Sequence, residues 1–181
     1  MTRPAALGAA WLAALLALGC APPIRTQVPP LESRPVVHSV LVQALEADTL
    51  KGAGVPDDAG TVVTNHVVAA LQSETKLRVV AEGESDAVMS GVILRYSERE
   101  GTASGVKRPA SVWFELQLRD REGAVLWSGA YEETQAALSD DVGSLPRAWE
   151  RGFRWVTAEE LADYGARMLA RDLQREIDTW S

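Results

Sequence analysis

Strict alternation between residues 111 and 119 constrains the fold of this chain more than any other feature. Apolar residues occupy every second position of this segment: Val112, Phe114, Leu116 and Leu118. Successive side chains of a strand point to opposite faces, so the pattern predicts a strand with one buried face and one wet face. The tetrapeptide DREG follows at 120–123, and its glycine suits the left-handed position of a tight hairpin turn. Residues 124–131 are then the partner strand.

Residues 87–96 form another strand candidate upstream of this hairpin. Four of its large residues share one phase of the alternation: Val88, Val92, Leu94 and Tyr96. The three segments together predict a three-stranded antiparallel meander over residues 87–133. Shorter runs rich in β-branched residues at 36–42 and 76–80 predict two more strands.

Two longer helices follow from the helical period. Over residues 59–73 the apolar positions recur at helical spacing and bury one face. Thr157 to Glu160 reads TAEE, the spacing of a capping box, and an apolar stripe continues from there to Trp180. Gly165 interrupts this helix, which indicates close packing at that point. A shorter helix is expected over residues 144–153.

These elements predict an α/β (α+β) fold: a mixed sheet with a three-stranded antiparallel meander, packed by one amino-terminal helix and carboxy-terminal helices. At 181 residues the chain has room for one ordinary domain and is too short for two sizeable cores. Its net charge of -7, with no compensating basic stripe, argues against nucleic acid as a partner.

The single cysteine, Cys20, ends an uncharged run over residues 5–18. A short cationic head before an apolar run of this length is typical of an export signal, and the run is shorter than the roughly 20 residues that span a bilayer. The sequence LALGC resembles the lipobox of bacterial lipoproteins, in which Gly19 and Cys20 match and the two residues before them stand in swapped order. The resemblance implies removal of residues 1–19 as a signal peptide and acylation of Cys20, with palmitate as the expected fatty acid.

A lipid on Cys20 also explains why an exported chain carries one unpaired cysteine. A free thiol is a liability in an oxidising compartment, and no second cysteine is present to pair with it. The alternative is an incidental thiol in a discarded segment. Ala21 follows the cysteine, where enteric lipoproteins retained at the inner membrane have aspartate. The resemblance therefore implies an outer-membrane lipoprotein that faces the periplasm, with the inner membrane as the alternative.

Residues 20–35 are rich in proline and show neither a helical nor a strand period. Such a segment favours extended polyproline conformation at about 3.1 Å per residue, which gives a reach of up to ~45 Å. We expect residues 20–35 to be a tether. Residues 36–181 are then a single periplasmic domain whose carboxy-terminal part, from about residue 140, is helical.

Two further segments resemble known envelope proteins. Ser85 to Val92 reads SDAVMSGV, and Gly123 to Tyr131 reads GAVLWSGAY. Both are similar to segments of bacterial envelope lipoproteins whose domain resembles the amino-terminal domain of the Tol-system translocation protein, and of the curli-secretion and penicillin-binding-protein-activator lipoproteins. The resemblance covers roughly residues 36–138. It implies a non-enzymatic protein that binds other envelope proteins.

The residues offer little support for catalysis or for a cofactor. A zinc site needs three or four ligands at characteristic spacing, and the chain has two histidines, His38 and His66. No G-x-S-x-G elbow accompanies either of them. The carboxylate pairs at 57–58, 132–133 and 140–141 are better explained as helix caps and solvated turns, because adjacent strand residues point to opposite faces. We expect no enzymatic activity, no metal and no cofactor.

Trp113 is the least expected residue of the meander, since it occupies the wet phase of its strand. Either the carboxy-terminal helices cover that face and bury it, or it belongs to an aromatic patch that binds a protein or lipid partner. The charged, glycine-containing loop at 97–108 is a second candidate contact region. The candidate partner-binding residues are therefore Trp113, Arg99, Lys107 and Arg108.

The sequence thus favours a membrane-anchored accessory or scaffold protein in cell-envelope assembly. Anchoring near membrane partners raises their effective concentration within reach of the tether. The alternative is a transport component for lipid or lipopolysaccharide, which needs a hydrophobic groove between sheet and helix. An envelope hydrolase is the third possibility, and a histidine clustered with carboxylates would favour it.

Overall fold

The computed structural model describes residues 23–30, 34–48, 55–102, 105–135 and 156–180. The described part contains a mixed seven-stranded sheet, a small two-stranded sheet and the helices α1 (Ala59–Glu74) and α3 (Ala158–Ile177). The strands are β1 (Ile24–Gln27), β2 (Ser39–Val42), β3 (Glu46–Ala47), β4 (Arg78–Val80), β5 (Ala87–Ser97), β6 (Glu100–Thr102), β7 (Gly105–Arg108), β8 (Ser111–Asp120) and β9 (Val125–Thr134).

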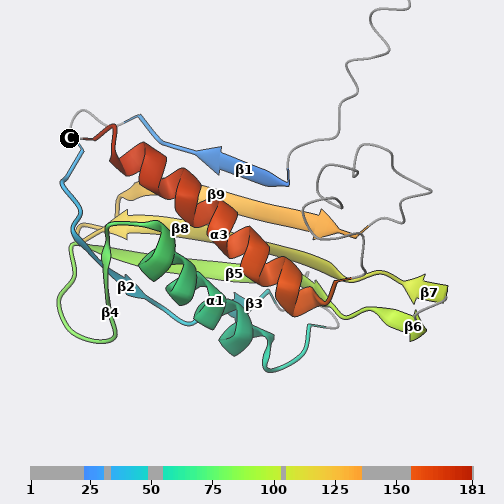
Figure 1. Cartoon of the computed structure of the whole chain (residues 1–181). Coiled ribbons are helices and arrows are strands. Elements are labelled where there is room, and N and C mark those ends of the chain that lie inside the picture. The colour runs from blue at the N-terminus through green and yellow to red at the C-terminus, as the bar shows by residue number, and fades with distance from the viewer. Residues whose placement is uncertain (1–22, 31–33, 49–54, 103–104, 136–155, 181) are drawn as a thin grey trace, which may run out of the picture.

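The main sheet has the strand order β1-β9-β8-β5-β2-β4, and β3 pairs with β5 beside β2. Strands β5, β8 and β9 form the expected antiparallel meander, β2 lies parallel to both β4 and β5, and β1 is antiparallel to β9. Both helices cover one side of the sheet, which we call the inner face, and the opposite side is the outer face (Figure 1). The predicted fold class is confirmed: a mixed sheet packed by helices.

The turn between β8 and β9 has the predicted chemistry. Gly123 has a φ of 87°, in the left-handed region that favours glycine. Its amide donates to the Asp120 carbonyl at 3.1 Å, and the Asp120 carboxylate accepts from the Ala124 amide at 2.7 Å. The register of β8 with β9 shifts once near the turn, between Leu118 and Arg119, and then continues to pair Trp113 with Glu132.

Strand β5 does not follow the regular alternation that we expected. Its register with β8 shifts between Ile93 and Arg95. Before the shift Met89 and Ile93 are buried, and after it Tyr96 is buried. The expected common phase of Val88, Val92, Leu94 and Tyr96 is therefore wrong. One extra residue is accommodated at the shift, so Leu94 and Tyr96 are buried after it, whereas Val92 before it lies on the outer face with 38% of its surface exposed.

Helix α3 begins at the predicted capping box. The Thr157 hydroxyl accepts from the Glu160 amide at 3.1 Å, and the Glu160 carboxylate accepts from the Thr157 amide at 3.0 Å. Two orphan donors of the first turn are thereby satisfied. Helix α1 begins after Asp58, whose side chain makes no capping hydrogen bond. The helix expected over residues 144–153 lies outside the described residues.

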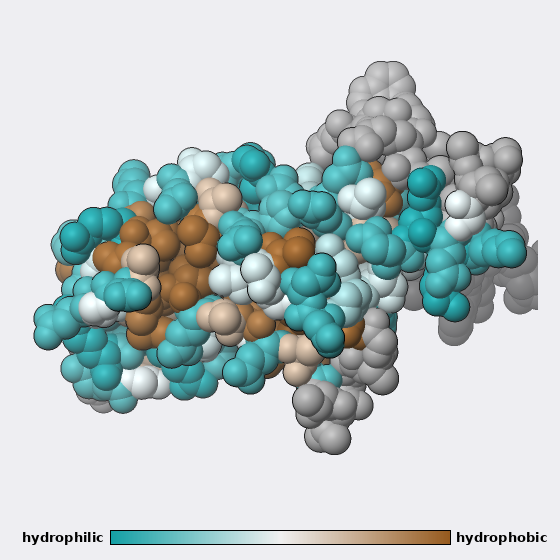
Figure 2. All heavy atoms as spheres, turned by 90° about the horizontal axis from the view of Figure 1, so that it is seen from below, coloured by the Kyte–Doolittle hydropathy of each residue, from teal (hydrophilic) through white to brown (hydrophobic). Residues whose placement is uncertain are grey.

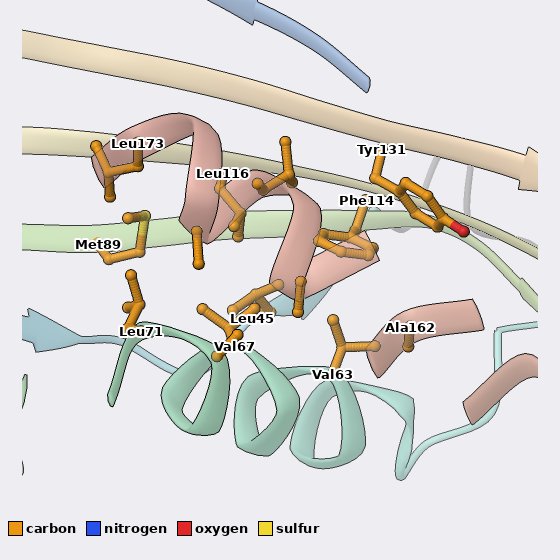
Figure 3. Packing of buried hydrophobic residues seen from close by; sticks show 14 of the residues in the cluster. Leu45, Val63, Val67, Leu71, Met89, Phe114, Leu116, Tyr131, Ala162 and Leu173 are labelled. Atoms are coloured by element: carbon orange, nitrogen blue, oxygen red, sulfur yellow. The ribbon is translucent and has the colours of Figure 1, made fainter. Parts of the chain in front are cut away.

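The core lies between the inner face of the sheet and the two helices (Figure 3). Labelled side chains from α1, the sheet and α3 converge there, among them Val67, Met89, Phe114 and Leu173. Gly165 of α3 packs directly against the Tyr131 ring, and a Cβ at this position would collide with ring atoms. The close packing predicted at Gly165 is confirmed.

Strand β1 corrects the expectation for the proline-rich segment. Ile24 to Gln27 pair with Tyr131 to Ser128 at the edge of the sheet, and the Glu132 amide donates to the Pro23 carbonyl at 2.9 Å. The prolines flank this stretch and leave its own amides available, and proline is tolerated at the ends of edge strands. The proline content of the whole segment predicts an unpaired tether. That average conceals the four consecutive residues without proline that pair with β9.

Residues 97–108 also contain regular structure. Strands β6 and β7 pair with each other and extend the β5–β8 end of the sheet (Figure 1). In the view of Figure 2, hydrophilic residues dominate this end, whereas hydrophobic residues gather on the half of the face that lies away from β6 and β7. No helix within the described residues is both long and apolar enough to cross a bilayer.

Candidate functional site

Trp113 lies on the outer face of β8, between Arg95 of β5 and Glu132 of β9. Its neighbour Phe114 points to the helices and is fully buried. The expectation that α3 covers Trp113 is therefore wrong, because alternation along β8 places the two rings on opposite faces. Residues 140–155, the rest of the region expected to cover it, lie outside the described residues.

A charged network surrounds the Trp113 ring. The Arg95 guanidinium lies 5.6 Å from the ring centroid, within cation–π range. Glu132 bridges neighbouring strands, with its carboxylate 2.7 Å from Arg25 Nη2 and 3.7 Å from Arg95 Nη1. We call Arg25, Arg95, Trp113 and Glu132 the Trp113 cluster. Exposed ion pairs of this kind each stabilise the fold by less than about 1 kcal/mol. The cluster therefore adds little to stability and stands out mainly as a charged and aromatic feature of the surface.

The indole N–H of Trp113 is buried and has no hydrogen-bond partner within the described part of the chain. The side chain as a whole is only half-buried. An unpaired buried donor costs about 1–3 kcal/mol. The part of Trp113 that a partner can reach therefore excludes its indole N–H.

The structure places the other three predicted partner-binding residues at the same end of the sheet. Lys107 and Arg108 are exposed on β7, and Arg99 is exposed just before β6. Arg108 pairs with Glu100 across the two strands at 2.9 Å. No hydrogen bond or ion pair among the described residues joins these side chains to the Trp113 cluster, so they share a location and not a contact network.

A groove of about 190 Å³ lies at the opposite end, between the start of β2 and the end of α3. Its lining is largely apolar and comprises Pro35, Val36, Val37, His38, Lys76, Leu77, Gln174, Ile177, Asp178 and Trp180. Val36 is 62% exposed. We call this the C-terminal groove. Sequence reasoning did not find it, because its residues come from three separate segments.

Polar groups mark the rim of the C-terminal groove. The Arg34 guanidinium lies 5.2 Å from the Trp180 ring centroid. Lys76 Nζ lies 2.9 Å from the Asp178 carboxylate, and this hydrogen bond is the main cause that lowers the pKa of Asp178. The Trp180 indole N–H, like that of Trp113, is buried without a partner among the described residues.

The histidines do not assemble a catalytic centre among the described residues. His38 is exposed, and within the described residues its backbone makes the hydrogen bonds: its amide donates to Asp86 and its carbonyl accepts from the Arg78 amide. His66 of α1 lies between two carboxylates of α3, at 3.5 Å from Glu159 and 3.4 Å from Asp163. This is the clustering that would favour a hydrolase, yet no hydroxyl or thiol in the described ranges is hydrogen-bonded to His66. The described residues also hold no group of metal-ligating side chains.

Two of the three carboxylate pairs lie within the described residues, and the expectation of helix caps and turns is wrong for the pair on β9, while Asp58 makes no side-chain cap. Glu132 belongs to the Trp113 cluster, whereas Glu133 accepts from the Tyr131 hydroxyl at 2.7 Å. Asp57 is exposed beside the α1 cap, and residues 140–141 lie outside the described residues. Adjacent glutamates on β9 diverge to opposite faces, as the alternation predicts.

Sequence reasoning missed the role of Asp86. One of its carboxylate oxygens accepts from the Ser39 hydroxyl at 2.9 Å and from the His38 and Ser39 amides at 3.0 and 2.9 Å. The Ser39 hydroxyl is the largest cause that lowers the pKa of Asp86. Asp86 therefore connects the start of β2 to the segment before β5, a structural role within the SDAVMSGV motif.

Comparison with known proteins gives a family and a fold. The family model for LptE, described as lipopolysaccharide-assembly, matches residues 37–177. The PelC dodecamer from Paraburkholderia phytofirmans is 17% identical with a TM-score of 0.58, over 83% of this chain and 96% of that one. Protein XCC0632 from Xanthomonas campestris is 16% identical with a TM-score of 0.53, over 84% and 93%. No curated protein sequence matches the chain.

The structural likenesses concern the fold alone, since the identities are low. The family match carries more, because it extends from the start of β2 to the end of α3. The coarser prediction of a bacterial envelope protein is thereby confirmed, and the finer resemblance to the Tol-system, curli-secretion and penicillin-binding-protein-activator lipoproteins stays a prediction. The chain belongs to the LptE family of lipopolysaccharide-assembly proteins.

Proposed function

We propose that this protein is a non-catalytic accessory lipoprotein that assists lipopolysaccharide assembly at the outer membrane and faces the periplasm. The observation that carries the proposal is the family match, which spans the helix-and-sheet fold from residue 37 to residue 177. The part played is that of a binding protein held beside other envelope proteins, with no cofactor.

The described side chains support a binding role over catalysis. His66 contacts two carboxylates of α3, and Glu74, the last residue of α1, pairs with Arg171 of α3 at 2.9 Å. These are contacts that fasten one helix to the other. A nucleophile and a base within hydrogen-bond reach of each other are the minimum for hydrolysis, and His66 has no such partner among the described residues.

The anchor in this proposal is an acylated Cys20. Its support is the uncharged run before it, the lipobox resemblance and the lack of a second cysteine. Two or more acyl chains give stable attachment, whereas a single chain binds a membrane only marginally. The partner-facing residues in this proposal are Trp113, Arg99, Lys107 and Arg108.

The C-terminal groove favours a second candidate function, in which the protein itself carries lipid or lipopolysaccharide. The groove lies between the sheet edge and α3, where a carrier would need it, and Val36 and Leu77 give it apolar walls. Its volume of about 190 Å³ is below the roughly 300–1,000 Å³ of pockets that enclose drug-sized ligands. It fits part of one acyl chain, so we rank the carrier function second.

Conditional depletion tests the proposed function. Loss of the protein is expected to lower the amount of lipopolysaccharide at the cell surface and to raise the amount in the inner-membrane fraction. Re-expression of the wild-type chain should restore the distribution. Unchanged surface lipopolysaccharide after complete depletion would contradict the assembly role.

A groove variant separates the two candidates. Val36→Asp places a charge at an exposed groove position and should leave the fold intact. The accessory function predicts full complementation by this variant, whereas the carrier function predicts loss of complementation and of binding to a fluorescent acyl-chain probe. Glu84→Asp, at an exposed position outside the groove lining, is the control.

A further inference from the structure

Helices α1 and α3 run in the same direction, and ionisable side chains join them at two points (Figure 1). At the end of α1, Glu74 pairs with Arg171 of α3 at 2.9 Å. Eight residues earlier on α1, His66 lies 3.4 Å from Asp163, which precedes Arg171 by eight residues on α3. The two points are therefore successive contacts of one parallel helix pair. We call them the Glu74 contact and the His66 contact.

The Glu74 contact keeps its charges from mildly acidic to weakly basic pH. Arg171 donates to both carboxylate oxygens of Glu74, at 2.9 and 3.1 Å, and a guanidinium is not deprotonated in this range. The hydrogen bond from Arg171 is the main cause that lowers the pKa of Glu74. The carboxyl group therefore stays ionised as well, and the end of α1 is held throughout the range.

The His66 contact depends on how many protons the imidazole carries. Its Nδ1 lies 3.4 Å from Asp163 Oδ1 and its Nε2 lies 3.5 Å from Glu159 Oε1, and only 22% of the side chain is exposed. A neutral ring has a single N–H, so its other nitrogen presents a lone pair to a carboxylate. The doubly protonated ring presents an N–H to each carboxylate. Arg167 does not compete for the same atom, because it donates to the other oxygen of Asp163 at 3.0 Å.

The other charged groups near the His66 contact are mainly acidic within the described part of the chain. The Glu98 carboxylate, after β5, accepts from the first amide of α3 at 3.2 Å, and Asp58 directly precedes α1. Burial, together with the carboxylates of Glu98, Glu159 and Asp58, raises the pKa of Tyr96 to about 12. The nearby cation is Arg167, which is bonded to a carboxylate, and the first-turn glutamates of α3 offset the positive end of its dipole. These surroundings favour a positive charge on the imidazole over a neutral ring.

We propose that His66 is a proton-operated clasp between α1 and α3. The doubly protonated ring joins the first half of α1 to the start of α3. After loss of one proton the first half of α1 loosens, while the Glu74 contact still holds its end. The proposal concerns the helix pair alone and depends neither on the lipid anchor nor on the proposed function.

The direction of the pH effect follows from proton binding. Because the folded chain favours the doubly protonated ring, it binds more protons than the unfolded chain in the range where histidine titrates. The clasp therefore strengthens as pH falls and weakens as pH rises. Ala59 and Val63 in the first half of α1 are buried in the core, so a weaker clasp opens this part of the core to water more often.

Amide hydrogen exchange of the mature chain in detergent micelles tests the clasp residue by residue. Protection factors, corrected for the intrinsic effect of pH on exchange, are compared at about pH 6 and about pH 8, on either side of the roughly 6.5 at which an unperturbed histidine titrates. His66→Gln removes the titrating group and keeps a polar side chain. His38→Gln is the matched control, because His38 is the other histidine of the chain and is exposed.

The expected effect is confined to the first half of α1. In the wild-type chain the protection factors at residues 63–69 should be about fivefold higher at the lower pH, and those at residues 71–74 should change by less than about twofold. His66→Gln should abolish this difference, and His38→Gln should preserve it. Nitrogen-15 spectra of the imidazole rings provide a second measurement: at about pH 7 most His66 rings should carry both protons, and most His38 rings should carry one.

Three results would overturn the proposal. Equal protection of α1 at both pH values in the wild-type chain would show that no proton controls the contact. The same pH dependence in the His66→Gln chain would assign the effect to other groups. A neutral His66 ring at about pH 7 would refute the clasp in the wild-type chain itself, so the test stands even where His66→Gln does not fold.

Discussion

The amide of Glu132 donates a hydrogen bond to the carbonyl of Pro23 at 2.9 Å, three residues after the cysteine expected to carry lipid. This contact starts the pairing of β1 with β9. The proline-rich segment would allow a reach of ~45 Å between Cys20 and the domain. Because Pro23 is already held, the Cα atoms of Cys20 and Pro23 are at most about 11 Å apart. An acyl chain on Cys20, as proposed, would therefore restrict the orientation of the domain at a membrane, which a long proline-rich tether would not do.

Removal of β1 should destabilise the domain. A chain that starts at Val28 loses the four β1 residues paired with β9 and the partly buried Ile24, and leaves the β9 edge unpaired. We expect the free energy of unfolding to fall by at least about 2 kcal/mol. Urea unfolding measures it, with a chain that starts at Pro23 as the control. Equal stabilities would show that β1 is not an integral strand.

Gly165→Ala should destabilise the fold, because the new Cβ collides with the Tyr131 ring. Overpacking of this kind costs about 1–3 kcal/mol. A double-mutant cycle with Tyr131→Leu identifies the cause: Gly165→Ala should cost less in the Tyr131→Leu background than in the wild-type chain. If the effects of the two substitutions on the free energy of unfolding are additive, the clash is not with the Tyr131 ring.

Asp86→Ala should lower the free energy of unfolding by at least about 2 kcal/mol near neutral pH, because it leaves the Ser39 hydroxyl and two amides without their acceptor. Glu84→Ala, at an exposed neighbouring position, is the control and should have an effect within about 0.5 kcal/mol.

The same variant should show a specific pH dependence. The folded pKa of Asp86 is lowered from 3.8 by the Ser39 hydrogen bond. Its contribution is therefore fully present above the unfolded pKa and is lost as pH falls through the folded pKa. The difference between wild type and Asp86→Ala should shrink when urea unfolding is repeated at about pH 3. A difference that grows on acidification would contradict the assigned role.

Trp113→Ala and Phe114→Ala test which face each aromatic residue occupies. Phe114 is fully buried in the core, so its truncation should cost about 3–5 kcal/mol. Trp113 is half-buried beside Arg95, and its truncation should cost clearly less. Comparable losses in the two variants would indicate that the outer face is as tightly packed as the inner one.

The hydrophobic periodicity of the sequence predicts most of the strands and helices. The strands that it misses or misplaces depend on pairing with strands that are distant in sequence. The alternation of Val112 to Leu118 and the DREG turn fixed β8 and β9 because both signals are local. The phase of β5 was wrong because the register shift at Ile93 depends on its partner strand. Strand β1 escaped notice because four residues carry too little pattern, and their pairing comes from the free edge of β9.

The candidate surfaces were predictable only in part. Trp113 stood out because an aromatic residue in a wet phase conflicts with the pattern around it. The C-terminal groove could not be found in this way, since Val36, Leu77 and Trp180 come together only after β2, β4 and α3 assemble. Asp86 was similarly hidden, because its partners on β2 lie far from it in sequence.

The central claim is that an acylated Cys20 holds this folded LptE-family domain at a membrane. Intact-mass analysis of the protein extracted from isolated outer membranes tests it most directly. We predict a chain that begins at Cys20 and bears the added mass of its acyl groups. The Cys20→Ala variant should no longer be found in the membrane fraction. Recovery from the soluble periplasm of a chain with a free thiol at Cys20, or with an amino terminus beyond it, would contradict the account.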